Sequence, residues 1–168
     1  MPIITHEGDM LDLPSGILVH GCNAQGVMES GIALQVKQRH PKAYREYERV
    51  VSTSPPSHRK MLLLGATPWV EVSKDLIIVN AITQENYGSD GKKYVSEKAI
   101  ETAFNFVQAL AASRRLPVHF PLIGCGLGGG EWSKIGPIIE RALGPAINGH
   151  LWLLPGDPML EVNPFLKT

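Results

Sequence analysis

The chain has 168 residues, enough for one domain whose hydrophobic core needs neither a metal nor a disulfide to stabilise it. Its 16 Lys and Arg residues balance 16 Asp and Glu residues, so it lacks the basic excess of proteins that bind nucleic acids through their phosphates, and a nucleic-acid partner is disfavoured. Two cysteines, Cys22 and Cys125, are too few for a disulfide framework and lack the spacing of a zinc site. We therefore expect a single domain over residues 1–168 that binds no metal and uses no cofactor.

Nothing in the sequence directs the chain to a membrane. Residues 1–12 lack the basic segment followed by an apolar one that makes a signal peptide. No apolar run approaches the roughly 20 residues that cross a bilayer as a helix. We expect a cytoplasmic monomer with no membrane partner.

In the first half of the chain, apolar runs alternate with segments of helical periodicity. Ile17–His20 is a compact apolar run, typical of a strand buried on both faces of a largely parallel sheet. A helix is expected from Gly31 to His40, where Pro41 interrupts the helical period. The other expected segments of this half are a short strand over Pro2–Thr5, a second helix over Lys42–Val51 and a solvated loop over Ser52–Arg59.

The second half continues the alternation. Glu97–Arg114 is the clearest helix, because its apolar residues recur at spacings of three and four. Further expected segments are apolar, strand-like runs over Lys60–Leu64 and Leu76–Ile82, an edge strand over Val70–Val72, a strand over Leu116–Ile123, a helix over Trp132–Leu143 and a final strand over His150–Leu154. Strands separated by helices predict a three-layer α/β/α sandwich with a mixed, largely parallel central sheet. Ligands of such sheets bind outside the carboxyl ends of the strands.

Two of the expected strands run into glycine-rich loops that each open a helix. These loops are Gly21–Gly31 and Gly124–Gly130. Glycines let the backbone approach a ligand closely, and the N–H groups of the following helix favour an anion. Either loop alone could be no more than a tight connection, but the pair predicts a clamp for a diphosphate. Neither loop matches the P-loop or the dinucleotide fingerprint, which disfavours a nucleotide triphosphatase or a nicotinamide dehydrogenase.

Four segments resemble the landmark motifs of macrodomains, in the expected order and over nearly the whole chain. They are Glu7–Leu11, His20–Asn23, Gly31–Gln35 and Pro121–Leu127. Within that family the likeness is closest to the branch that holds ADP-ribose 1″-phosphate phosphatases together with hydrolases of ADP-ribosyl-glutamate and DNA-ADP-ribose. The resemblance therefore implies a macrodomain fold and an ADP-ribose-type ligand.

The resemblance also implies roles for individual residues. Asp9 would accept a hydrogen bond from the adenine amino group, beside the backbone of Met10, although an aspartate here could simply form a turn. Asn23 would bind the hydroxyls of the distal ribose and take part in catalysis. The residues implied for the remaining contacts are Gly31, Ile32 and Ala33 along the diphosphate, Ile123, Gly124, Cys125, Gly126, Leu127 and Gly128 in the second phosphate loop, and Pro155 and Asp157 beside the adenosine.

His20 is the candidate for acid, base or nucleophilic chemistry, because an ordinary histidine titrates near neutral pH. It could attack phosphorus or protonate the leaving oxygen, or it could be a buried histidine that hydrogen bonds satisfy beneath the sheet. Cys22 and Cys125 are interpreted as small packing residues, since neither has a neighbouring base in the sequence.

The sequence departs from the glycosidic-bond hydrolases of this branch at two points. Those proteins resemble one another in a lysine after the central strand and an acid just past Gly-Cys-Gly-Leu. Here Ile82–Gly88 holds no lysine, and no acid follows Leu127 until Glu131. The sequence therefore offers no evident lysine that could attack C1″ as a nucleophile.

Three functions stay open: a phosphatase of ADP-ribose 1″-phosphate, which these departures favour, a hydrolase of ADP-ribosylated protein or nucleic acid, and a reader without catalysis. The segment Tyr87–Lys93 is either a flap over the ligand or a solvated connection.

Overall fold

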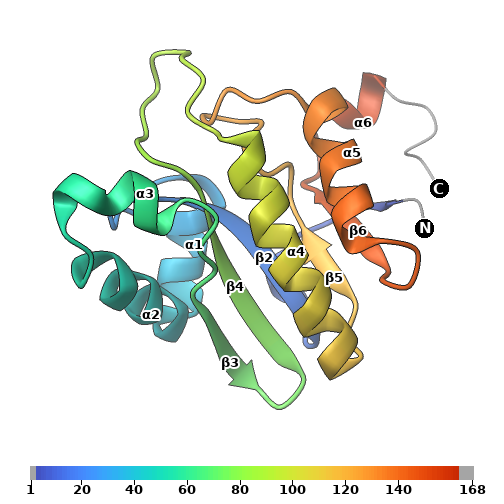
Figure 1. Ribbon diagram of the computed structural model, residues 1–168. Coiled ribbons are helices and arrows are strands. Elements are labelled where there is room, and N and C mark those ends of the chain that lie inside the picture. Colours follow the sequence, from blue (N-terminus) through green and yellow to red (C-terminus); the bar gives the residue numbers. More distant parts are fainter. Residues whose placement is uncertain (1–2, 163–168) are drawn as a thin grey trace.

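The computed structural model describes residues 3–162, which form a central six-stranded sheet between two layers of helices (Figure 1). The strand order is β1-β6-β5-β2-β4-β3, and every neighbouring pair is parallel except β3 with β4. The strands are β1 (Ile4–Glu7), β2 (Gly16–Asn23), β3 (Trp69–Ser73), β4 (Leu76–Gln84), β5 (Val118–Phe120) and β6 (Gly149–Leu153).

Helices cover both faces of the sheet. They are α1 (Gly31–Arg39), α2 (Pro41–Ser52) and α3 (Arg59–Leu63) on one face, and α4 (Glu97–Arg114) and α5 (Trp132–Leu143), with the short α6 (Met159–Val162) beside α5, on the other (Figure 1). Two 3-10 helices, η1 (Met10–Asp12) and η2 (Pro56–His58), complete the elements. This arrangement confirms the three-layer α/β/α sandwich with a mixed, largely parallel sheet. No helix among residues 3–162 is long and apolar enough to cross a membrane.

The apolar run of β2 is continuous because the strand contributes to the core on both faces of the sheet. Ile17 and Val19 pack in the cluster beneath α4 and α5, and Leu18 packs in the cluster beneath α1. The rings of Phe104 and Phe120 meet edge to face with their centroids 5.5 Å apart, which joins α4 to the sheet. The alternation along β2 thus decides which of its side chains face each layer.

Two expectations from local pattern were wrong. The run Lys60–Leu64 is not a strand: residues Arg59–Leu63 form helix α3, in which Leu63 alone is buried while Met61 and Leu62 are exposed. Because this run buries only one of its five side chains, it does not need to lie inside the sheet. Its backbone groups form their hydrogen bonds within a helical turn and require no neighbouring strand. The strand expected over Leu116–Ile123 is shorter, because Pro117 and Pro121 flank β5 and cannot donate to a ladder. Pro2, the first residue of the expected N-terminal strand, lies outside the described residues.

The loops that follow β2, β4 and β5 emerge at the same edge of the sheet (Figure 1). The second and third of these loops are joined, since the backbone N–H groups of Tyr94 and Val95 both donate to the carbonyl oxygen of Gly128, at 2.8 and 3.0 Å. A single bridge between Gln84 and Val95 extends this contact to the end of β4. The carboxyl edge of the sheet therefore presents one connected set of loops.

Candidate functional site

Two neighbouring clefts lie at this carboxyl edge. Their volumes are about 520 and 340 Å³, and both fall in the range of small-molecule sites. The clefts share Gly31, Ile32 and Pro121 as lining residues. They therefore meet at the first turn of α1, and an elongated ligand with a different group at each end could occupy both.

The smaller cleft has apolar walls and one carboxylate. Met10, Leu11 and Trp152 line it from η1 and β6, and Asp9 is also a lining residue. The Oδ1 atom of Asp9 accepts a hydrogen bond from the backbone N–H of Leu11 at 2.9 Å, so Asp9 caps η1. Asp9 therefore forms the turn and also lines a cleft, and its contact with a base stays a prediction.

The larger cleft is bounded by the three loops at the sheet edge and by the N-terminus of α1. Gly31, Ile32 and Ala33, in the first turn of α1, line this cleft. The backbone N–H groups of that turn have no partner within the helix, and the side chain of Ser30 at the N-cap forms no hydrogen bond to them. A further cleft wall comes from the loop that begins at Gly124. This is the geometry of an anion site at a helix N-terminus.

Glycine is required at some positions of that loop for different reasons. A Cβ atom at Gly128 would lie 2.7 Å from the carbonyl oxygen of Gly124, so Gly128 is needed for packing of the loop on itself. A Cβ atom at Gly126 would meet nothing within 4 Å, and Gly126 lines the larger cleft. Gly126 therefore leaves space that a ligand can use, whereas Gly128 serves the fold.

Charged side chains are scarce around both clefts. Among the described lining residues there is no Lys, Arg or His, and the charged ones are Asp9 and Glu29. The carboxylate of Glu29 pairs with Lys37 of α1 at 3.2 Å. An anionic ligand would consequently be held by backbone N–H groups rather than by cationic side chains.

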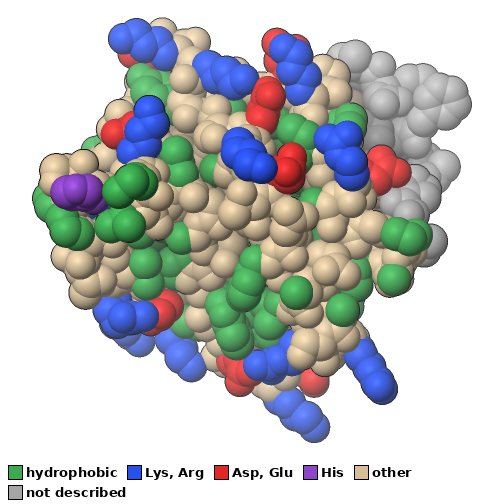
Figure 2. Space-filling view, viewed as in Figure 1, with side chains coloured by type: hydrophobic (Ala, Val, Ile, Leu, Met, Phe, Trp, Pro, Cys, Tyr) green, Lys and Arg blue, Asp and Glu red, His purple; other side chains and the backbone are tan. Residues whose placement is uncertain are grey.

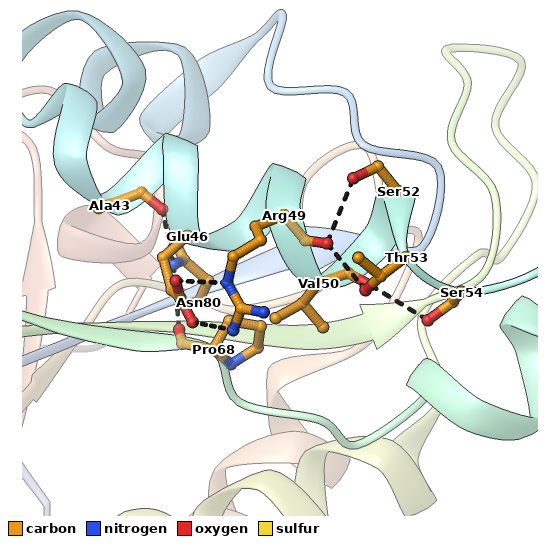
Figure 3. Close-up of polar contacts among 9 residues, drawn as sticks. All are labelled: Ala43, Glu46, Arg49, Val50, Ser52, Thr53, Ser54, Pro68 and Asn80. Carbon is orange, nitrogen blue, oxygen red and sulfur yellow. Dashed lines mark hydrogen bonds and ion pairs between the residues drawn. The ribbon is translucent and has the colours of Figure 1, made fainter.

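His20 does not reach either cleft. The residue is 1% exposed, and its Nε2 atom lies 2.7 Å from Oδ1 of Asn80 on the neighbouring strand. The Nδ2 group of Asn80 donates to the carbonyl oxygens of Ala43 and Pro68 (Figure 3). Burial lowers the pKa of His20 to about 4, although the hydrogen bond to Asn80 acts in the opposite direction, so the ring is neutral at pH 7. The expectation that His20 contacts the substrate does not match this geometry: β2 points the side chain beneath α2, into a hydrogen-bonded buried network.

Asn23 lines the larger cleft, but most of its hydrogen-bonding capacity serves its own loop. Its Oδ1 atom accepts from the backbone N–H of Gln25 and from the hydroxyl of Tyr47, both at 2.9 Å. Its Nδ2 group donates to the carbonyl oxygen of Val27 at 2.8 Å. One N–H of this amide is left for a ligand. Asn23 is positioned to organise the loop and to offer a single donor to the cleft.

Most of the expected binding residues line the clefts, and three do not. Ile123, Gly124, Gly126, Leu127 and Gly128 line the larger cleft together with Gly31, Ile32 and Ala33, and Met10 lines the smaller one. Cys125, Pro155 and Asp157 are not among the lining residues, and Leu154 lies at the smaller cleft instead. Asp157 accepts from the backbone N–H of Met159 at 2.9 Å and so begins α6.

Neither thiol has the environment of a nucleophile. Burial raises the pKa of Cys125 to about 11, and its Sγ atom donates to the carbonyl oxygen of Ile123. Cys22 lines the larger cleft, but burial raises its pKa still further. The interpretation of both cysteines as packing residues fits these environments.

The sequence interpretation left several residues of the clefts unassigned, among them Trp152, Gln84 and Glu29. Trp152 lines the smaller cleft, stacks on His6 and donates from Nε1 to Nδ1 of His119 at 3.0 Å. Gln84 and Glu29 line the larger cleft. Gln84 was within reach of prediction, because it ends a central strand at the edge where ligands bind. Glu29 and Trp152 carry no comparable pattern.

A mostly parallel sheet, glycine-rich loops after two of its central strands and a cleft without cationic side chains at a helix N-terminus are typical of α/β domains that bind phosphorylated ligands through backbone N–H groups. The chain belongs to the macro domain family, whose model matches residues 19–139.

Relatives and solved structures accord with this family. The chain is 24% identical over 147 residues to a DNA ADP-ribosyl glycohydrolase of Thermus aquaticus, covering 88% of this chain and 39% of that protein. It is 49% identical over 73 residues to an ADP-ribose 1″-phosphate phosphatase of Ajellomyces capsulatus, covering 42% of this chain and 26% of that protein. A macrodomain protein from Streptomyces coelicolor superposes with a TM-score of 0.67 at 30% identity, covering 90% of this chain and 98% of that one. The chain thus spans about two fifths of the length of the Thermus relative.

Proposed function

We propose that the protein binds ADP-ribose along the two clefts, with the adenine in the smaller cleft and the distal ribose in the larger one. The observation that carries this proposal is the meeting of the clefts at Gly31, the first residue of α1. A diphosphate at that point would receive backbone N–H groups and the favourable end of the helix dipole. The named relatives from Thermus and Ajellomyces both act on ADP-ribose compounds, which supports the same ligand.

The smaller cleft suits adenine by shape and by hydrogen bonding. Met10, Leu11 and Trp152 offer apolar surface for a planar base. The carboxylate of Asp9 only accepts hydrogen bonds, and the exocyclic amino group of adenine only donates them in this role. Asp9 would therefore select the amino edge of the base.

We further propose that the protein hydrolyses a substituent from the distal ribose. The first candidate is the phosphate of ADP-ribose 1″-phosphate, supported by the 49% identity to the Ajellomyces phosphatase over 73 residues. Because His20 lies outside the cleft, the attacking group in this proposal is a water molecule bound near Asn23 and Gln84. The described residues hold no group of three or more His, Cys, Asp and Glu side chains suited to a metal, so we expect the reaction to withstand EDTA.

A second candidate is release of ADP-ribose from a macromolecule, supported by the match to the Thermus glycohydrolase over 88% of this chain. The face of the molecule seen in Figure 2 carries Lys and Arg interspersed with Asp and Glu, without a continuous basic stripe. That mixture gives no preference for a nucleic-acid substrate over a modified protein.

Three measurements on one protein preparation test these proposals. Calorimetric titration with ADP-ribose should give a dissociation constant in the micromolar range, which corresponds to a binding free energy of about −7 to −9 kcal/mol. Phosphate release from ADP-ribose 1″-phosphate and release of ADP-ribose from ADP-ribosylated DNA and protein then separate the two hydrolase candidates. Tight binding without either release would reduce the function to that of a reader, and absence of binding would overturn the proposal as a whole.

A further inference from the structure

The turn that carries Asp9 is held by a single arginine from the end of α1. Arg39 donates from one terminal nitrogen to Oδ2 of Asp9 at 3.0 Å. Its other terminal nitrogen donates to the carbonyl oxygen of Leu11 at 3.1 Å and to Oδ1 of Asp12 at 2.6 Å. One guanidinium thus contacts three of the four residues from Asp9 to Asp12.

These contacts fix a geometry more than they add stability. The side chains of Arg39 and Asp9 are about one third exposed, and an ion pair at such a site contributes little to folding. The planar fork of a guanidinium, however, can hold several acceptors at fixed angles, which a flexible ammonium cannot do. The role of Arg39 is therefore to be sought in the position of Asp9.

The carboxylate of Asp9 is anchored on both oxygens. Oδ1 accepts from the backbone N–H of Leu11, and Oδ2 accepts from Arg39. Each carboxylate oxygen has a further lone pair, so the anchored group can still accept from a ligand in the smaller cleft, which Asp9 lines. Without Arg39, Asp9 and Asp12 would stand near each other as two like charges, and Asp9 would be held through Leu11 alone.

Helix α1 connects this anchor to the other end of the proposed ligand. Its first residues, Gly31 and Ile32, line both clefts, and Gln35 and Gln38 line the smaller one. Arg39 is the last residue of the same helix. The helix consequently sets the spacing between the proposed diphosphate position and the acceptor for the base.

We propose that Arg39 is a positioning residue that determines the base specificity of the site. It holds the Asp9 carboxylate where an exocyclic amino group can donate to it. A base with a carbonyl oxygen at that position would place two acceptors together, with no proton between them, and would be rejected. This inference rests on the proposed binding of ADP-ribose.

The test is a comparison of two ligands, ADP-ribose and its analogue with hypoxanthine in place of adenine, by calorimetric titration. The wild type should prefer ADP-ribose by about ten-fold or more, as expected for one hydrogen bond to a charged group. Arg39→Ala should weaken ADP-ribose binding by about ten-fold and leave the analogue within about two-fold, so that the preference disappears. Arg39→Lys should restore part of the preference, because an ammonium reaches Asp9 without forming the fork.

Arg49→Ala is the matched control. Arg49 pairs with Glu46 on the outer side of α2 at 2.7 Å (Figure 3), and neither residue lines a cleft. This variant should bind both ligands like the wild type. Thermal unfolding of each variant separates loss of the fold from loss of selectivity, and Arg39→Lys answers the question if Arg39→Ala does not fold.

Four results would overturn the inference. Retention of the full preference in Arg39→Ala would show that Leu11 alone positions Asp9. An equal loss of both ligands in Arg39→Ala and Arg39→Lys would show that Arg39 shapes the cleft without selecting the base. A wild type that binds both ligands equally would remove base selection while leaving ADP-ribose binding intact, whereas a wild type that binds neither would end the proposed function together with the inference.

Discussion

Asp9 has a role in the fold that can be separated from its proposed role in binding. Asp9→Asn keeps an oxygen that can accept from Leu11 and so keeps the cap of η1, whereas Asp9→Ala removes it. We expect Asp9→Ala to weaken ADP-ribose binding by about ten-fold or more, and to lower the free energy of unfolding by about 1 kcal/mol. Asp9→Asn should lose affinity with a smaller loss of stability. Calorimetry and denaturant unfolding measure both quantities, and unchanged affinity in a folded Asp9→Ala protein would refute the assignment.

The glycines of the second loop provide a pair of opposite variants. Gly126→Val places its side chain in the open space of the larger cleft, so affinity for ADP-ribose should fall by about ten-fold or more while Tm stays unchanged. Gly128→Ala forces a backbone contact with Gly124 and should cost about 1–3 kcal/mol of stability. A drop in Tm for Gly126→Val without a separate effect on binding would mean that the loop is purely structural.

Substitution of His20 tests whether this residue belongs to a buried hydrogen-bonded network or takes part in the reaction. His20→Ala leaves Oδ1 of Asn80 without its donor in the interior, so we expect a loss of stability of at least about 1–3 kcal/mol, with ADP-ribose affinity changed by less than a few-fold. Asn80→Ala should produce a loss at least as large, since it breaks the same hydrogen bond together with those to Ala43 and Pro68. Phosphate release that vanished in His20→Ala, with unfolding and binding unaffected, would instead place His20 in the reaction.

At the scale of elements, β1, β6 and β5 bring a row of histidines together. His6 lies 2.8 Å from His150, and His150 stacks on His119, which accepts from Trp152. Burial, and after it the neighbouring His150 and His6, together lower the pKa of His119 to about 4. The pKa of His150 is also lowered, first by burial and then by His6. His119 and His150 are therefore uncharged in the folded protein at neutral pH.

The low pKa values predict the direction of acid sensitivity. His119 and His20 take up protons near pH 6.5 when unfolded and near pH 4 when folded. The contribution of these two histidines to the free energy of unfolding is therefore fully present above pH 6.5. It is lost as the pH decreases from 6.5 to 4, by at most about 3 kcal/mol for each group. Urea unfolding between pH 4 and 8 measures this slope. His119→Gln should flatten part of it, and a stability independent of pH across this range would contradict the prediction.

At the scale of the whole molecule, the proposed ligand would contact elements from both ends of the chain. The clefts are lined by residues from Gly8 near the N-terminus to Leu154 after β6. A ligand that binds only the folded state should stabilise it by about 2.7 kcal/mol at a hundred-fold excess over its dissociation constant. For a domain of this size we expect Tm to rise by roughly 5–10 °C in saturating ADP-ribose. A thermal shift assay checks this, and Gly126→Val, which should keep its own Tm, should show a much smaller rise.

Much of the fold could be predicted because its information is local. The spacing of apolar residues in Glu97–Arg114 and the compact apolar runs of β2 and β4 reflect burial on one or two faces, which any such segment must satisfy. Glycine-rich connections after β2 and β5 mark the edge where the clefts lie. The strand predicted over Lys60–Leu64 was wrong, because a short apolar run is compatible with either a strand or a helical turn, and here it forms α3.

The sequence by itself determined the alternation of strands and helices, the two glycine loops and the family motifs, since each depends on residues close together in the chain. Only the tertiary structure decided where particular side chains point. His20 lies beneath α2, where its hydrogen-bond partner is Asn80, 60 residues further along the chain. Asp9 is anchored by Arg39, which is 30 residues away. Hydrogen bonds between distant residues depend on how helices pack against the sheet, and no local pattern encodes that packing.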